Sequence, residues 1–274
     1  MESHQIVSRD EWSAARIALL EHEKALTRHS DQVSAERLAL PWVRVEKEYL
    51  FDGPEGKLTF SDLFRGNSQL YIKHFMMAPG AQHQCVGCSL EVDHMDGILP
   101  HLENHDVRYA VVARAPIEEI EVVRKRMDWK FLWVSSFGSE FNYDFNVSFK
   151  PEDVAAGRAQ YNFGPAPQWA ANTQDLSGRS VFYKNEAGKI FHTYSAYGRG
   201  GDNRTTGRGS GRSFRPRLLF RTCCAAAPNR RENDRDPSPR PARRARRSPA
   251  SMWPPAHRKP WLPRCRPRAV RRVR

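Results

Sequence analysis

The chain has 274 residues and a formal net charge of +13 at pH 7, which at first suggests a nucleic-acid-binding protein. The charge is uneven, because residues 201–274 hold 22 basic against 4 acidic side chains, whereas residues 1–200 hold 22 basic against 27 acidic ones. We therefore expect a mildly acidic soluble body, long enough for one domain with a core, followed by a basic tail.

The start of the chain bears on where the protein resides. Its first residues, MESHQIVSRDEW, lack the basic start and apolar segment of a secretory signal. No apolar run approaches the ~18 residues that a membrane span needs. We expect a cytoplasmic protein without membrane contact. Thiols stay reduced in the cytoplasm, so a close pair of cysteines there is more often catalytic or metal-binding than a structural disulfide.

The first predicted element is a helix over about residues 8–40, which forms an N-terminal helical extension. Ser8 and Glu11 have the spacing of a capping box at its start. The expected apolar face consists of Trp12, Ala15, Leu19, Leu20 and Leu26. After Pro41, residues 42–51 alternate between apolar and polar, which predicts one edge strand, and residues 52–56 form a turn.

A strand, a loop and a helix are predicted around the two cysteines of the body. Residues 70–77 are an apolar run typical of a buried strand, and Pro79–Gly80 breaks it. Cys85 and Cys88 follow, and a helix is predicted to start at the second cysteine, with Cys85 at or just before its N-terminus. Its expected apolar face is Leu90, Met95, Ile98, Leu99 and Leu102.

Alternating strands and helices continue through the rest of the body. We predict a strand over residues 107–113, a helix over 117–129, a strand over 131–134 and a hairpin over 179–197. Residues 151–176 have weak periodicity and are expected to form a long surface excursion. Trp42, Trp129 and Trp133 occupy apolar positions and are predicted to lie in the core. The order of elements resembles the thioredoxin superfamily, an α/β fold with a central mixed sheet flanked by helices.

Three segments carry a more specific resemblance. HFMMAPGAQHQCVGCS, WVSSFGSEFNYDFNVSF and SVFYKNEAGKIFHTYSAYGRG resemble a bacterial thioredoxin-like family known as domain of unknown function 899, over about residues 5–200. The resemblance implies a thioredoxin-like fold with Cys-x-x-Cys on the first catalytic helix, and it implies no established substrate. It stops after Gly200, which gives a thioredoxin-like domain over residues 1–200.

Two departures from better-known relatives are visible. Thioredoxins place a cis-proline before the hairpin strand that faces the dithiol, whereas this chain has Ser177-Gly178-Arg179 there. Peroxiredoxins carry a threonine three residues before the reactive cysteine, where this chain has Gln82, and an arginine at the hairpin. Arg179 is a candidate for holding a thiolate by charge, and a solvated arginine at a strand end is the simpler alternative.

Cys85 and Cys88 have three interpretations. As a redox site, Cys85 would attack a disulfide with a lowered pKa and Cys88 would resolve the mixed disulfide. As a metal carrier for copper or zinc, the pair would need a histidine, with His74, His83, His94, His101 and His192 as candidates. A non-catalytic thioredoxin-like domain is the third interpretation. We favour a cytosolic thiol–disulfide oxidoreductase of unknown protein or small-molecule substrate, without a cofactor or metal.

Supporting roles at the site are assigned to four residues. His83, two residues before Cys85, is a candidate for stabilising the thiolate, as is Arg179, and a loop histidine in water is the more common case. Asn142 and Asp144 lie in the family-specific block and are candidates for lining the dithiol pocket, or for capping and turning the backbone there.

The tail, residues 201–274, contains 21 arginines, one lysine and 11 prolines, and we expect it to be disordered. Its composition and the abrupt loss of family likeness indicate out-of-frame translation of a GC-rich gene. Nucleic-acid contact through such a tail would be non-specific and sensitive to salt.

Overall fold

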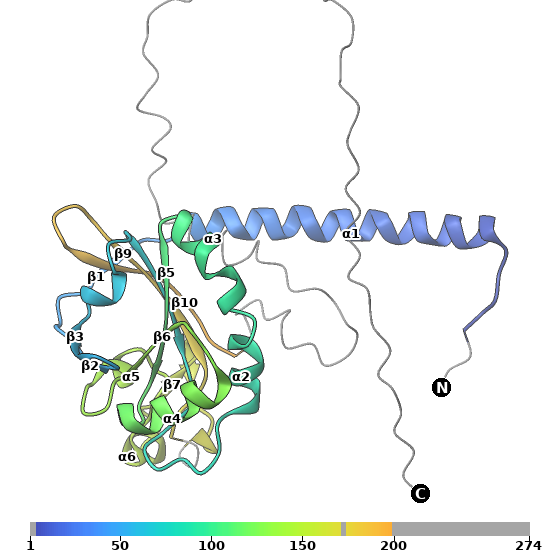
Figure 1. Cartoon of the computed structure of the whole chain (residues 1–274). Helices are drawn as coiled ribbons and strands as arrows, with labels where there is room; N and C mark the ends of the chain where they lie inside the picture. The colour runs from blue at the N-terminus through green and yellow to red at the C-terminus, as the bar shows by residue number, and fades with distance from the viewer. Residues whose placement is uncertain (1–3, 171–173, 199–274) are drawn as a thin grey trace, which may run out of the picture. The chain divides into compact units, whose positions relative to one another are not determined.

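The computed structural model describes residues 4–170 and 174–198 (Figure 1). The predicted tail lies outside these residues. The helices are α1 (Arg9–Leu38), α2 (Val86–Val92), α3 (Leu99–Asn104), α4 (Ile117–Met127), α5 (Phe141–Asp144) and α6 (Pro151–Ala155), with 3-10 turns η1 (Asp62–Phe64) and η2 (Asp96–Ile98). The strands are β1 (Val43–Arg44), β2 (Leu50–Gly53), β3 (Gly56–Thr59), β4 (Gln69–His74), β5 (Val107–Ala113), β6 (Leu132–Ser135), β7 (Gln160–Tyr161), β8 (Gly164–Pro165), β9 (Gly178–Lys184) and β10 (Ile190–Ala196).

Eight of the strands form one mixed sheet in the order β1-β10-β9-β4-β5-β6-β2-β3. The strands β4, β5 and β6 are parallel, and the hairpin of β9 and β10 joins them with β9 antiparallel to β4. The segment that carries the cysteines therefore leaves from the middle of the sheet. This arrangement is the predicted thioredoxin-like α/β fold, with the hairpin predicted at residues 179–197.

The sheet has an apolar core on each face because side chains alternate along its strands. In β5, Tyr109, Val111 and Ala113 point to one core, whereas Ala110 and Val112 point to the other. The first core is covered by α2, α3 and α4, and the second by η1, α5 and the β2–β3 hairpin. In Figure 1, α2 lies to the right of the central strands of the sheet, and its strands β2 and β3 lie at the left. Burial on both faces explains why the central strands read as continuous apolar runs.

The N-terminal helical extension is α1, and the predicted capping box is present at its start. Ser8 accepts a hydrogen bond from the backbone N–H of Glu11, and the Glu11 carboxylate accepts one from the Ser8 N–H. None of the side chains of α1 is buried against the described residues. Trp12, Leu19 and Leu26 are each about half exposed. None of the described helices combines the length and apolar character that a membrane crossing needs.

Residues 42–51 do not form the single edge strand that their alternation predicts. They contribute β1, which pairs with β10 at one edge of the sheet, and the start of β2, which pairs with β6 near the other edge. The segment between the two strands crosses from one side of the sheet to the other, and Tyr49 is buried on the way. Trp42 is 41 % exposed and packs obliquely on Tyr183, so its predicted core position is wrong, whereas Trp129 and Trp133 are buried.

The predicted surface excursion has structure of its own. It contains α6 and the short β7–β8 hairpin, and it encloses a third apolar cluster of Phe149, Val154, Ala170 and Leu176. The spacing is not periodic because these residues come from turns and short elements.

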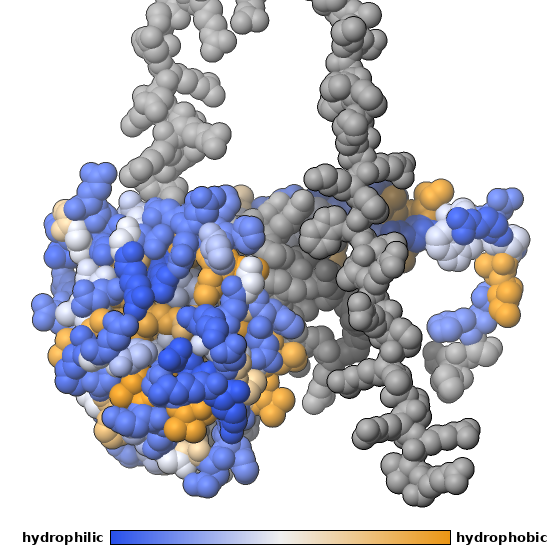
Figure 2. Space-filling model, in the orientation of Figure 1, coloured by the Kyte–Doolittle hydropathy of each residue, from blue (hydrophilic) through white to orange (hydrophobic). Residues whose placement is uncertain are grey.

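On the visible face of the molecule, polar residues surround smaller apolar patches (Figure 2).

Candidate functional site

The strand order places the two cysteines at the carboxyl edge of the parallel strands. After β4, a loop through Pro79 and Gly80 leads to Cys85, which is the N-cap of α2. The helix begins at Val86, immediately after the first cysteine, so the predicted start at Cys88 is wrong by two residues. Cys85 has extended backbone angles, φ −63° and ψ 115°, which suit an N-cap. A capping sulfur can therefore take the place that an oxygen usually fills.

The environment of Cys85 favours a thiolate. Its Sγ accepts a hydrogen bond from the backbone N–H of Cys88 at 3.3 Å and lies 3.8 Å from the Sδ of Met76. The hydrogen bond from the Cys88 side chain lowers the pKa of Cys85 most. Partial burial opposes this, while the N–H groups of Cys88 and Gly87 and the charge of Lys73 lower the pKa further, to about 6 from 9.0. A thiol of this acidity is largely ionised at pH 7.

Cys88 differs from Cys85 in both exposure and acidity. Only 2 % of Cys88 is exposed, whereas Cys85 is half-buried. The pKa of Cys88 is raised well above 9.0, first because its thiol donates a hydrogen bond to Cys85 and second because it is buried. Both cysteines are free thiols in this structure. The pair is thus one accessible acidic thiol beside one shielded neutral thiol.

A buried ion-pair network lies behind the dithiol. Lys73 on β4 and Arg179 on β9 both bind the carboxylate of Glu91 on α2, each at an N–O distance of 2.7 Å. The Lys73 side chain is fully buried, and those of Arg179 and Glu91 are 10 % and 13 % exposed. Arg179 is therefore not the solvated residue of the simpler alternative. Lys73 also donates a hydrogen bond to the hydroxyl of Ser177, 2.5 Å away.

The excursion of residues 151–176 packs beside the same site. Met76, which contacts the sulfur of Cys85, also packs against the third apolar cluster. Tyr161 packs against that cluster too, and its hydroxyl donates a hydrogen bond to the carbonyl of Ser177 at 2.8 Å. Cys88 and Arg179 both influence the pKa of Tyr161, which burial raises above 10.0. The excursion thus forms one wall of the dithiol site.

The other predicted supporting residues have partners away from the sulfurs. The Oδ1 of Asn142 accepts a hydrogen bond from the Ser136 hydroxyl at 2.9 Å. Asp144 accepts hydrogen bonds from Lys47 and Tyr49, at 2.6 and 2.8 Å. All of these contacts are to side chains, so they are neither contacts with the sulfurs of the dithiol nor caps on the backbone. His83 is exposed in the loop two residues before Cys85.

Two of the histidines that a metal site could use, His74 and His192, have hydroxyl partners of their own. His74 is buried and hydrogen-bonds the Ser180 hydroxyl at 2.9 Å, and His192 hydrogen-bonds Ser195 at 2.7 Å. Within residues 4–170 and 174–198, no three His, Cys, Asp or Glu side chains gather as a metal site requires. Among these residues, Cys85 and Cys88 thus lack the third ligand that a metal centre needs.

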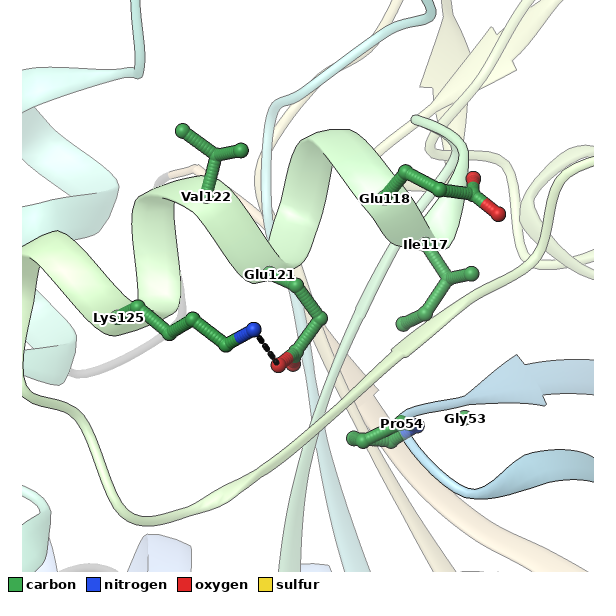
Figure 3. Close-up of a pocket in the computed structure, with 7 residues that line it drawn as sticks. All are labelled: Gly53, Pro54, Ile117, Glu118, Glu121, Val122 and Lys125. Atoms are coloured by element: carbon green, nitrogen blue, oxygen red, sulfur yellow. Dashed lines mark ion pairs between the residues drawn. The ribbon is translucent and has the colours of Figure 1, made fainter.

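Two surface hollows lie apart from the cysteines. One, of about 410 Å³, lies between α4 and the turn at Gly53 and Pro54, where Lys125 pairs with Glu121 at 3.9 Å (Figure 3). The other, of about 280 Å³, lies where β5 and β6 end, beside Arg114 and Phe137. Neither is lined by a cysteine, so neither is the dithiol site.

Sequence reasoning missed Lys73 and Glu91. The signal for Lys73 is a lysine at the centre of the apolar run LYIKHF, where the alternation points it to the same face as Tyr71 and Phe75. Glu91 lies three residues after Cys88, on the same side of the helix. A buried lysine needs a carboxylate partner, which makes the helix behind the cysteines the place to look.

The fold and the site together define a thioredoxin-like protein with two cysteines at the start of the helix that follows the central strand. Within this class, the chain belongs to the family described as bacterial protein of unknown function (DUF899), whose profile matches residues 1–207. The resemblance of the three sequence segments is thereby confirmed.

Solved structures similar to this chain include a peroxidoxin, a peroxiredoxin and a thio-disulfide isomerase. Peroxidoxin BcpB from Mycobacterium tuberculosis is 11 % identical with a TM-score of 0.38, over 57 % of this chain and 84 % of that one. The mitochondrial 2-cys peroxiredoxin from Plasmodium falciparum is 10 % identical with a TM-score of 0.37, over 57 % and 79 %. A thio-disulfide isomerase from Thermus thermophilus is 16 % identical with a TM-score of 0.32, over 70 % and 100 %. No curated protein matches the sequence.

Proposed function

We propose that the protein is a thiol–disulfide oxidoreductase in which Cys85 attacks and Cys88 resolves. The observation that carries the proposal is the difference between the two thiols. Cys85 is half-buried, caps a helix and has a pKa of about 6, whereas Cys88 is 2 % exposed and has a raised pKa. Attack needs an accessible thiolate, and resolution needs a nearby thiol that large substrates do not reach.

The reaction follows from these positions. The Cys85 thiolate attacks one sulfur of a substrate disulfide, so a mixed disulfide forms and the first substrate thiolate leaves. Cys88 then loses its proton and attacks the sulfur of Cys85, which releases the second substrate thiolate. The substrate gains two electrons, and the protein is left with a Cys85–Cys88 disulfide. Cellular thiols would have to reduce this disulfide, which suits a reducing compartment such as the cytoplasm.

Trapping with glutathione disulfide tests the assignment. We expect Cys88→Ser to retain one glutathione on Cys85, because the resolving thiol is missing. Cys85→Ser should retain none on Cys88, which is buried. Peptide mapping by mass spectrometry separates the site from Cys223, Cys224 and Cys265 further along the chain. If both variants trapped glutathione equally, or if neither did, the assignment of Cys85 as the attacking thiol and Cys88 as the resolving thiol would be contradicted. The non-catalytic thioredoxin-like domain would then be the better interpretation.

A further inference from the structure

The residue before Cys85 folds its side chain over the first turn of α2. Gln84 is half-buried, and its Nε2 donates a hydrogen bond to the hydroxyl of Ser89 at 2.7 Å. Ser89 is buried, and its hydroxyl in turn donates to the backbone carbonyl of Cys85 at 2.9 Å. One chain of hydrogen bonds therefore runs from the side chain of Gln84 to the backbone of the candidate attacking residue.

This arrangement is a polar version of a helix-start motif. Cys85 is the N-cap of α2, so Gln84 holds the position before the cap and Ser89 is the fourth residue of the helix. Apolar side chains at these two positions often pack together and fix the angle at which the chain enters a helix. A hydrogen bond between Gln84 and Ser89 fixes the same angle through a directional contact. The carbonyl of Cys85 also accepts the backbone N–H of Ser89 at 2.9 Å, so side-chain and backbone contacts hold it together.

Helix α4 holds the loop in front of Cys85 at two points. Arg126 donates a hydrogen bond to Oε1 of Gln84. The carboxylate of Glu119 accepts the backbone N–H of Gly80, at 3.0 and 3.3 Å from its two oxygens. Glu119 and Arg126 are seven residues apart, about two turns of helix, so both lie on one face of α4. The amide of Gln84 thus connects α4 on one side to the first turn of α2 on the other.

The angle at which the chain enters α2 decides where the sulfur of Cys85 lies. Its Sγ accepts the backbone N–H of Cys88 at 3.3 Å. A hydrogen bond weakens steeply as it departs from linearity, so a rotation of the backbone at Cys85 would weaken this one. An N–H that points at a sulfur stabilises the thiolate more than the thiol. Fixing the backbone of Cys85 therefore favours the form of the sulfur that attacks.

We propose that Gln84 is a positioning residue of the dithiol site, which holds Cys85 in its N-cap geometry through Ser89 and is itself held by Arg126. The inference rests on the proposed function, because it concerns how readily the attacking thiol reacts. Disulfide exchange itself involves the sulfurs alone. Gln84 acts on that exchange through the backbone of Cys85.

A double-mutant cycle in the full chain tests the proposal. Gln84→Met keeps the length of the side chain but removes both of its hydrogen bonds, and Ser89→Ala removes the hydroxyl. Gln84→Asn, whose amide is too short to reach Ser89, serves as a second variant should Gln84→Met not fold. Gln82→Met is the matched control, because the amide of Gln82 donates within the loop, to the carbonyl of Gly80 at 3.3 Å. The rate of iodoacetamide alkylation of Cys85 is measured against pH with peptide mapping, and urea denaturation reports folding.

Gln84→Met should raise the midpoint of the alkylation profile by about half a pH unit, so that the rate at pH 5 falls about threefold. Ser89→Ala should cause a similar shift. The double variant should shift no further than the larger single one, because both substitutions break the same chain of hydrogen bonds. Gln82→Met should match the wild type. Cys88 and Lys73, which also act on the pKa of the attacking thiol, are unchanged in all of these variants.

Two results would overturn the inference. One is a profile of Gln84→Met that matches that of Gln82→Met. The other is a double variant in which the shifts of Gln84→Met and Ser89→Ala add, because the two side chains would then act independently. If instead the Gln84→Met shift were present but Cys88→Ser retained no glutathione, the inference would stand and the proposed function would fall.

Discussion

Lys73 lies directly opposite Arg179 in the antiparallel register of β4 and β9. Two like charges in facing positions repel each other, and here both are buried. Glu91 lies between them on the helix that starts at Cys85, with 2.7 Å to each. The ion pairs therefore connect the middle of the sheet to the helix that presents the thiols. The fold keeps this arrangement next to the dithiol despite its cost in desolvation.

The first prediction concerns the hydrogen bond between the two cysteine side chains. Because this bond is the largest cause of the low pKa of Cys85, Cys88→Ala should raise that pKa by about one unit. Cys88→Ser keeps a hydroxyl donor at the same place and should raise it less. The pH dependence of iodoacetamide alkylation at Cys85, followed by peptide mapping, measures the difference. Identical profiles for the two variants would show that the side chain of Cys88 has no such role.

The second prediction concerns His74, which is buried and neutral. Burial, with smaller contributions from Lys73 and His192, lowers its pKa to about 3 from 6.5. Below about pH 6.5, His74 therefore binds a proton in the unfolded chain but not in the folded chain. The free energy of unfolding has its full value above about pH 6.5 and decreases as the pH falls towards 3. One proton bound only by the unfolded chain lowers the free energy of unfolding by about 1.4 kcal/mol for each pH unit. Between pH 6.5 and 4.5, the free energy of unfolding should therefore fall by ~2 kcal/mol more in the wild type than in His74→Gln.

Urea denaturation at the two pH values gives the comparison. His83→Gln is a matched control, because His83 is exposed and its replacement should leave the pH dependence as in the wild type. If His74→Gln loses as much stability on acidification as the wild type does, His74 takes up its proton in the folded chain.

The third prediction concerns the tip of the β7–β8 hairpin. Asn162 and Phe163 have φ of +53° and +62°, and a bulky side chain is strained in that region. Phe163 is 80 % exposed, so little burial is lost on its removal. We expect Phe163→Gly to raise the free energy of unfolding by about 1 kcal/mol. Phe163→Ala removes the ring but keeps the strain, and a similar gain in this variant would assign the effect to the ring.

The central elements of the fold could be predicted because their burial leaves a clear pattern. The run at residues 107–113 is β5, since a parallel strand covered on both faces is apolar throughout. The prediction of a single edge strand at residues 42–51 was wrong because alternation shows which side chains are buried but not which strands pair. The apolar cluster within residues 151–176 could not be predicted because its residues come from short elements, which are too short to show a periodic pattern.

The candidate site could be predicted as far as Cys85 and Cys88, whose spacing before a helix is a local feature. Asn142 and Asp144 could not be placed, because their partners Ser136, Lys47 and Tyr49 are fixed by packing and not by spacing. The network behind the dithiol joins residues 18 to 106 positions apart, and only the tertiary structure brings them together.

The most direct test of the account is the rate of iodoacetamide alkylation of Cys85 in the reduced wild-type protein between pH 4 and 9. A thiol with a pKa of about 6 should reach its full rate by pH 7 and lose about tenfold per pH unit below pH 6. Cys88 should stay unmodified over the same range, because it is buried and its pKa is raised. A midpoint for Cys85 near the ordinary value of ~8.5 would contradict the assignment of this residue as the attacking thiol.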